Sequence, residues 1–307
     1  MSVNDAQLHE FYLETVRRLR RRGVLCAITS GLACVHYNVA ETTKDCDLLC
    51  HPDSFGALLE VLSALERDGH QCRYRGNLSP PLDARWHRGG WTSHFTWGHG
   101  PAAVTLDVFG RALRGSMPWE DEISGLFINQ HIVAEMKRTN RDKDWPFISL
   151  LGEQLLAAGD PRGWLHLFDA EMLARLARRH DCPEEVMHQR PVLRLARQGD
   201  SRLRMALHAE RCFWEELDRL RIEILRRALR PFVVAVARAA IPASSPLPEQ
   251  HTIRVRCAEA TLVKSPLLEY GLERHLADAR EATARLVHPE ALEWLPDVTP
   301  NFNFLVP

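Results

Sequence analysis

The sequence predicts an α+β fold in which a small mixed β-sheet with flanking helices precedes a mostly helical domain. Two observations predict it. Short apolar runs, interrupted by Gly, Pro and charged residues, recur between residues 24 and 129. From residue 130 onward, apolar residues recur instead at the three- and four-residue spacing of amphipathic helices. We therefore expect one domain at residues 1–150 and a helical domain at residues 151–307.

The first part of the chain is predicted to alternate helices and strands. The pattern of residues 4–22 is that of an amphipathic helix, and Gly23 ends it. The other predicted helices here cover 32–37 and about 53–68. The predicted strands are 24–29, 46–50, 70–75, 91–97, 103–109 and 125–129, with a loop at 76–90 and a hairpin turn at 98–101.

The second part of the chain is predicted to be helical apart from a linker at 241–250, which is rich in Pro and Ser. The helices 161–229 are rich in Leu, Ala and Arg. We expect their apolar faces to pack together and their arginines to remain solvated. The predicted helices are 130–139, 142–158, 161–180, 183–198, 200–229, 231–240 and 267–286.

Composition places the chain among globular proteins. It has 307 residues, of which 45% are hydrophobic and 26% charged, and a net charge of −1. It has no apolar run of the roughly 18 residues that a membrane span needs, and its first residues do not resemble a signal peptide. The eight cysteines include no C-x-x-C pair, so neither a disulfide framework nor a zinc site is expected. We expect a cytoplasmic protein without a membrane partner.

Three aspartates form the central candidate site. Asp45 and Asp47 are two residues apart on a predicted strand, so their side chains point to the same face. Their mutual repulsion is costly unless a cation lies between them, and oxygen ligands of this kind suit Mg²⁺. Asp107 lies within the apolar run 104–109 and therefore needs a partner of its own. A strand that carries Asp107 beside the first strand would gather all three carboxylates.

A turn upstream of the aspartates is a candidate phosphate site. Ser30 and Gly31 follow a predicted strand and open a predicted helix, where backbone N–H groups can meet a phosphate. Gly31 permits a close approach, and the Ser30 hydroxyl can donate a hydrogen bond.

Taken together, residues 28–49 (ITSGLACVHYNVAETTKDCDLL) resemble the signature of the polymerase-β-like nucleotidyltransferase superfamily. The closer resemblance is to the bacterial branch of AbiEii-type toxins and related small nucleotidyltransferases. In that branch, a turn of small residues precedes Thr-x-Asp-x-Asp-Leu, here 43–48, and a distant third carboxylate corresponds to Asp107. The family's turn usually begins with Gly, where this chain has Ser30.

The resemblance extends into residues 126–151, where a helix ending in Lys137 leads into Arg141, Lys143 and Asp144. It covers roughly residues 20–160. It implies that Asp45, Asp47 and Asp107 are catalytic and bind two Mg²⁺ ions. It also implies that Ser30, Gly31 and Lys137, with Lys44 and Arg141, contact the triphosphate. Two other interpretations remain open: Lys137 and Arg141 cap helix ends, and Lys143 and Asp144 form a surface ion pair, which we favour.

The implied activity is transfer of a nucleoside monophosphate from an NTP such as ATP, with release of pyrophosphate. The acceptor hydroxyl belongs to RNA such as tRNA, to a protein, or to a small molecule such as an antibiotic. A toxin–antitoxin or phage-defence role with a partner protein is one expectation. A catalytically inactive fold that acts as a regulator or interaction module is the alternative of another class.

Several residues near these motifs have more than one interpretation. His94 and His99 flank the predicted hairpin and either orient an acceptor or are solvated. Trp91 and Trp97 either stack a base or pack in the core, and we favour the core. The arginines between 17 and 22 form either a solvated helix end, which we favour, or an RNA contact.

Overall fold

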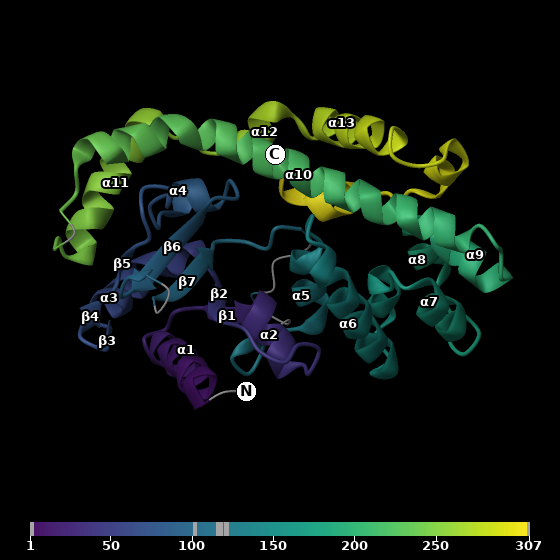
Figure 1. Cartoon of the computed structure of the whole chain (residues 1–307), viewed down its shortest axis with the longest axis horizontal. Coiled ribbons are helices and arrows are strands. Elements are labelled where there is room, and N and C mark those ends of the chain that lie inside the picture. Colours follow the sequence, from purple (N-terminus) through teal and green to yellow (C-terminus); the bar gives the residue numbers. More distant parts are fainter. Residues whose placement is uncertain (1–2, 101–102, 115–118, 120–122, 243, 306–307) are drawn as a thin grey trace. The chain divides into compact units, whose positions relative to one another are not determined.

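The fold was described from a computed structural model of the chain (Figure 1). The structure describes every residue except 1–2, 101–102, 115–118, 120–122, 243 and 306–307, and for 3, 4, 124 and 303–305 it describes only the backbone. It is a mixed α/β protein with one mixed sheet and a long helical region, as predicted. Within the described residues, no helix combines the length and the apolar character needed to span a membrane.

The sheet has seven strands in the order β5-β6-β7-β2-β1-β9-β8. It is mixed because β2 pairs in parallel with β7, and β1 with β9, whereas the other pairs are antiparallel. A separate two-stranded hairpin joins β3 (Glu66–Arg67) and β4 (His70–Gln71). The strands of the sheet are β1 (Cys26–Thr29), β2 (Asp45–Cys50), β5 (Arg73–Tyr74), β6 (Thr92–Trp97), β7 (Val104–Phe109), β8 (Ile123–Ser124) and β9 (Phe127–Ile128).

Side-chain alternation gives the central strands one apolar face and one polar face. Along β7, Val104, Leu106 and Val108 are buried, whereas Thr105 and Asp107 are only partly so. On the apolar face, Phe11 of α1 (Val3–Arg21) meets the ring of Trp97 edge-on at 5.2 Å. Trp97 also donates its Nε1–H to the Leu65 carbonyl at 3.2 Å, just after α3 (Phe55–Ser63). Helices therefore cover the apolar face at these points, and the polar face carries the candidate site.

Two short helices complete this part of the chain, α2 (Ser30–His36) and α4 (Ala84–His87). The helices of the second part are α5 (Gln130–Lys137), α6 (Trp145–Ala157), α7 (Ala170–Ala177), α8 (Glu184–Gln189), α9 (Val192–Gln198), α10 (Leu203–Ala239), α11 (Leu247–Thr261), α12 (Pro266–Tyr270) and α13 (Leu272–Ala284). Short 3₁₀ helices lie at Pro52–Ser54, Asp142–Asp144, Pro161–His166, Pro289–Trp294 and Thr299–Leu305.

Several helix predictions were wrong in detail. α10 runs for 37 residues straight through Pro231, where a break was predicted. The predicted helix 161–180 is instead a 3₁₀ segment followed by α7. α11 begins inside the predicted linker, and the predicted helix 267–286 is divided at Gly271, whose φ of 92° lies in the left-handed region.

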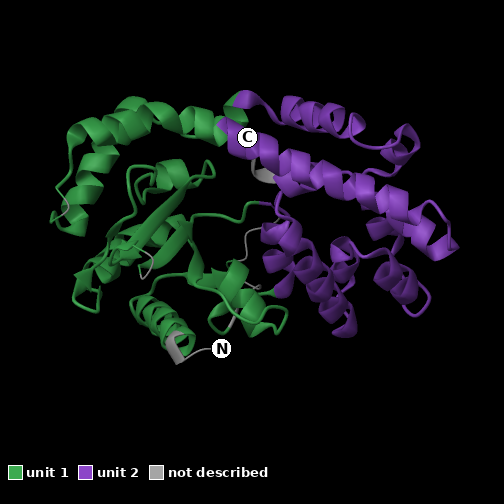
Figure 2. Ribbon diagram, viewed as in Figure 1, with its two compact units in different colours: residues 1–113, 117–129, 225–269 green, residues 114–116, 130–224, 270–307 purple. Residues whose placement is uncertain are grey.

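The chain forms two compact units, coloured separately in Figure 2. Unit 1 comprises residues 1–113, 117–129 and 225–269, and unit 2 comprises residues 114–116, 130–224 and 270–307. Each unit therefore draws on several stretches of chain, and α10 contributes to both. The division into domains at residue 150 stays a prediction.

Each unit has an apolar core with buried polar groups. In unit 1, Trp91 packs with Phe232 of α10 and with Leu262, which directly follows α11, and its Nε1–H bonds the Val263 carbonyl at 2.8 Å. Trp91 and Trp97 are thus core residues, as favoured. All eight cysteines are described and are free thiols.

Unit 2 buries one of the arginines that was expected to be solvated. Arg190 is 2% exposed, and its Nε bonds the Glu210 carboxylate at 2.9 Å. Its other donors bond the Trp164 and Leu167 carbonyls at 2.6 and 2.7 Å. The expectation of solvated arginines was wrong for Arg190, because a buried guanidinium whose donors meet a carboxylate and carbonyls is tolerated inside a helical core.

The buried histidines predict acid sensitivity. Burial lowers the pKa of His87 to about 3, so the folded state keeps it neutral while the unfolded state takes up a proton near pH 6.5. The unfolded state binds more protons between these values, so stability falls as pH falls below 6.5. We expect a loss of about 1.4 kcal/mol per pH unit from His87 alone, measured by denaturant unfolding between roughly pH 4 and pH 7.

The His87→Gln variant removes this proton uptake, so its stability should decline less steeply with acid than that of the wild type. Exposed His180 offers the control, because His180→Gln should leave the slope unchanged. Parallel slopes for the wild type and His87→Gln would show that His87 does not titrate as inferred.

Candidate functional site

The strand register brings the three predicted aspartates to one face of the sheet. β2 and β7 pair in parallel with Asp45 opposite Thr105 and Asp47 opposite Asp107. Residues directly opposite each other in adjacent strands project to the same side, and so do residues two apart along one strand. Asp45, Asp47 and Asp107 therefore share the polar face of the sheet.

Asp107 is held by two basic side chains. Arg75 Nη2 donates to both Asp107 carboxylate oxygens, at 2.9 and 3.2 Å. His94 stands opposite Asp107 on β6, and its Nδ1 lies 2.8 Å from Asp107 Oδ1. The Asp107 side chain is 23% exposed, so it remains accessible to solvent. The partner that an aspartate in an apolar strand requires is thus supplied by Arg75 and His94.

The two aspartates of β2 have surroundings that differ from those of Asp107. Asp45 Oδ1 accepts a hydrogen bond of 2.7 Å from the Thr105 hydroxyl, which compensates it only in part. Between Asp45 and Asp47 lies Cys46, whose thiol pKa is raised well above its usual value by burial and by the neighbouring carboxylates. The thiol is therefore neutral. The three carboxylates share one face of the sheet, and oxygen donors of this kind suit Mg²⁺.

The segment that leads into Asp45 is held from two sides. From α1, His9 Nε2 lies 2.9 Å from the Thr43 carbonyl, and the buried Tyr12 hydroxyl lies 2.9 Å from the Lys44 carbonyl. From the other side, a Cβ added at Gly31 would lie only 2.7 Å from Thr43 Oγ1. Gly31 thus makes room for the segment that positions Asp45. The Lys44 side chain, next to Asp45, is exposed.

Ser30 has an unusual backbone conformation. Its φ of 55° lies in the left-handed region, which glycine adopts without cost and other residues do not. Ser30 opens α2 directly after β1, whose last residue Thr29 is paired with Asp47. The turn predicted to contact phosphate therefore lies beside the aspartates, and it has the backbone shape that explains why a glycine is expected there.

The other predicted triphosphate contacts, Lys137 and Arg141, belong to unit 2. Lys137 Nζ lies 3.2 Å from Asp144 Oδ1, and Arg141 Nη2 lies 2.7 Å from Asp144 Oδ2. Asp144 is buried and Lys143 is exposed, so the favoured surface pair between these neighbours was wrong. Asp144 instead forms ion pairs with Lys137 and Arg141.

A cavity of about 530 Å³ adjoins the carboxylates. Arg75, which binds Asp107, and Thr105, which binds Asp45, both line it. Its basic lining residues include Arg73, Arg254 and His99, and none of its described lining residues is acidic. The volume is in the range typical of ligand sites, and the basic lining favours an anionic ligand.

Arg254 holds the backbone of this lining in place. It comes from α11, and its guanidinium donates to the carbonyls of Ser79 and Gly76 at 2.8 and 2.7 Å and stacks 4.6 Å from the Tyr74 ring. Arg73 donates to the Gly98 carbonyl at 2.9 Å and contacts His99. Sequence reasoning missed Arg73, Arg75 and Arg254, because each lies far from the aspartates in sequence and belongs to no recognised motif. His94 was considered, but the solvated interpretation was favoured.

Unit 2 contains a second cluster of possible metal ligands. The ligand atoms of His131, Glu135 and His166 all lie within 4.8 Å of one another, and all three residues are buried. Arg138 donates to His166 Nδ1 at 3.0 Å, so the His166 proton lies on Nε2, which is 2.8 Å from His131 Nδ1. Burial and Arg138 lower the pKa of His166 well below its usual value. The nitrogen that a metal needs is thus occupied by a proton, and we interpret the cluster as a buried hydrogen-bond network.

Comparison with known proteins adds nothing to this site: no protein-family model matches the chain, and no curated protein matches it either.

The left-handed φ of Ser30 leads to a stability prediction. Ser30→Gly removes the Cβ that disfavours this conformation, and we expect it to raise the free energy of unfolding by up to about 1 kcal/mol, since added freedom in the unfolded chain offsets part of the gain. Ser30→Val, with a branched Cβ, should lower it. Urea denaturation measures both.

Ser30→Ala is the matched variant, because it keeps the Cβ and removes the hydroxyl. It should be no more stable than the wild type. Equal stability of the Ala and Gly variants would mean that the backbone conformation is not the source of the effect.

Proposed function

We propose that the chain is a Mg²⁺-dependent nucleotidyltransferase that transfers a nucleoside monophosphate from an NTP to an acceptor hydroxyl. The proposal depends above all on one observation, the register that sets Asp47 opposite Asp107 with Asp45 on the same face. The resemblance of residues 28–49 to the polymerase-β-like superfamily supports it. So does the Ser30–Gly31 turn beside Asp47, with its glycine-like backbone.

In this proposal Asp45 and Asp47 would hold one Mg²⁺ ion, and Asp107 would contribute to holding a second. When bound, the ions neutralise the charge of the phosphates. The acceptor oxygen forms a bond to the α-phosphorus, the bond from that phosphorus to the bridging oxygen breaks, and pyrophosphate leaves. Asp107 takes the proton of the acceptor hydroxyl, and His94 orients the Asp107 carboxylate through their 2.8 Å contact.

The lining of the cavity beside Asp107 indicates which class of acceptor it suits. Its described lining has Arg73, Arg75 and Arg254 and no carboxylate, so it is suited to an anionic acceptor. An RNA such as tRNA fits this charge, whereas a cationic antibiotic does not. We therefore favour RNA over a small cationic molecule, and we place a protein acceptor second.

An inactive fold that serves as a regulator or partner-binding module is the second candidate. The specific observation in its favour is that Arg75 and His94 already engage Asp107. An active enzyme must move Arg75 away from the carboxylate when a metal binds, whereas a regulator has no such requirement. Labelling of an acceptor decides between the two.

Purified protein incubated with Mg²⁺, radiolabelled NTPs and total RNA should label an RNA. Asp45→Asn and Asp47→Asn should each lower the labelling rate by at least about 100-fold, because each removes a charge that holds the triphosphate's metal. The control is Asp53→Asn, at an exposed carboxylate paired with Arg88, and it should label normally. Labelling that persists in Asp45→Asn would contradict the mechanism.

A second prediction concerns the acceptor cavity. Arg73→Glu reverses a charge in the lining without touching the aspartates, so it should raise the KM for RNA about tenfold or more and leave the KM for the NTP nearly unchanged. The matched control is Arg226→Glu on the exposed face of α10. Equal effects of the two variants on the KM for RNA would exclude this cavity as the acceptor site.

A further inference from the structure

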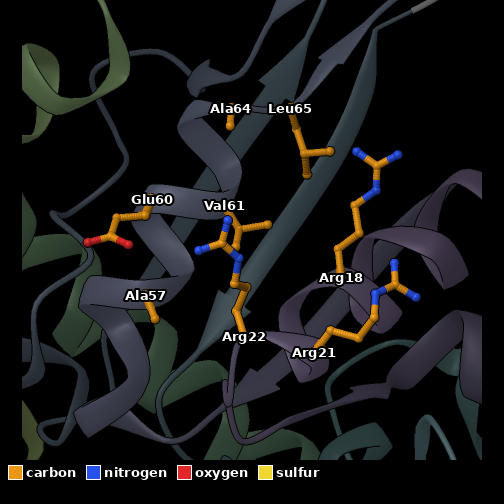
Figure 3. A pocket seen from close by; sticks show the side chains of 8 residues that line it. All are labelled: Arg18, Arg21, Arg22, Ala57, Glu60, Val61, Ala64 and Leu65. Atoms are coloured by element: carbon orange, nitrogen blue, oxygen red, sulfur yellow. The ribbon is translucent and has the colours of Figure 1, made fainter.

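A second basic pocket lies within unit 1, away from the carboxylates. It has a volume of about 450 Å³ and lies between the end of α1 and α3 (Figure 3). Arg18, Arg21 and Arg22 line one side. The residues of the other side are Ala57, Glu60, Val61, Ala64 and Leu65. We call it the arginine pocket.

The arginine pocket carries excess positive charge. Arg18 and Arg21 share the Glu14 carboxylate, at 3.4 and 2.7 Å, and remain 54% and 62% exposed. Arg22 is exposed and has no ion pair among the described residues. Glu60 is the one acidic residue among the described lining residues, and the Glu14 carboxylate is shared with Arg17 as well. Exposed guanidinium groups that lack full pairing are ready donors for phosphate oxygens.

The opposite wall of the pocket consists mostly of small apolar side chains. Ala57, Val61 and Ala64 follow one another at helical spacing and offer neither hydrogen-bond donors nor aromatic rings. Apart from the Glu60 carboxylate, this wall has no group that can read the edge of a base, and it has no ring on which a base can stack. The pocket is therefore suited to phosphate groups with a sugar against the small apolar side chains, which is recognition of a nucleic-acid backbone without sequence readout.

α1 connects this pocket with the candidate site. Tyr12 bonds the Lys44 carbonyl next to Asp45, and Arg21 lies nine residues further along the same helix. With a helical rise of 1.5 Å per residue, this corresponds to about 14 Å, roughly the axial length of four nucleotides in one strand of a duplex. The arginine pocket is thus separated from the segment that positions Asp45 by about 14 Å along α1, which covers the face of the sheet opposite to the aspartates.

We propose that the arginine pocket binds the phosphodiester backbone of the RNA acceptor as a second contact outside the catalytic site. This inference rests on the proposed function, but binding does not require catalysis, so the two are tested separately. Binding here fixes the position of the RNA, whereas the cavity beside Asp107 receives the reacting hydroxyl.

The test is RNA binding by fluorescence anisotropy, with a labelled transcript of tRNA size, without NTP and with a chelator present. The triple variant Arg18→Ala, Arg21→Ala, Arg22→Ala should bind at least about tenfold more weakly than the wild type at moderate salt. The slope of log affinity against log salt should fall in magnitude by roughly two to three between roughly 50 and 200 mM salt, because each arginine that is removed leaves one phosphate without its cation.

The matched control removes three exposed arginines elsewhere, by Arg178→Ala, Arg179→Ala and Arg230→Ala, with the same change of net charge. It should keep the wild-type affinity and salt slope. Circular dichroism and thermal melting should show that both triple variants are folded. Equal losses of affinity in both variants, or no RNA binding by the wild type, would overturn the proposal.

Competition distinguishes the source of the phosphate. Inorganic phosphate and AMP, each at millimolar concentration, should displace RNA poorly. If AMP binds in an arginine-dependent manner while the triple variant keeps the RNA affinity of the wild type, the pocket is a nucleotide site and the proposal is wrong. Loss of RNA binding in the triple variant together with an Asp45→Asn variant that still binds RNA supports the pocket even where no transfer is detected.

Discussion

The parallel pairing of β2 with β7 is the constraint on which the candidate site depends. It sets Asp47 directly against Asp107, an arrangement that is repulsive unless positive charge is supplied. The surroundings follow from this need: Arg75 and His94 reach Asp107, and Thr105 hydrogen-bonds Asp45. α1 and Gly31 hold the segment that brings Asp45 to this place. These contacts thus stabilise the arrangement in which the three aspartates share one face of the sheet.

The local elements of the sheet were predictable because their signals are local. The alternation in residues 104–109 and the apolar run 24–29 each identify a strand without reference to the rest of the chain. The same holds for the placement of Asp45 and Asp47 on one face. What joins β2 to β7 is a contact between segments about 60 residues apart, and no periodicity specifies it. The pairing of Asp107 with the other two aspartates was therefore predicted mainly from the resemblance to a family. The basic residue Arg75, which contacts Asp107, was not predicted.

Helix boundaries show where propensity was misleading. Proline disfavours a helix interior, yet α10 continues through Pro231, with Phe232 and Val236 buried against α11 on the following turns. Tertiary burial outweighs the missing hydrogen bond there. The burial of Arg190 could not be predicted from the sequence, because the carbonyls and the carboxylate that its guanidinium meets belong to other segments of the chain. Ser30 is a different case, since the sequence showed only a serine where glycine is usual in the family it resembles, and the structure adds the left-handed φ of 55°.

The discontinuous make-up of unit 1 has a consequence for biosynthesis. Its strands are complete by residue 129, but Gln250 and Arg254, which bond the backbone of Tyr74, Gly76 and Ser79, are translated more than a hundred residues later. While the ribosome elongates unit 2, the wall of the basic cavity beside Asp107 is still missing. The nascent chain thus carries its carboxylates with Arg73 and Arg75 early and gains the cavity wall contributed by α11 late, when α11 has emerged. A chain interrupted before that point would keep the aspartates and Arg75 and would lack the cavity wall formed by Gln250 and Arg254.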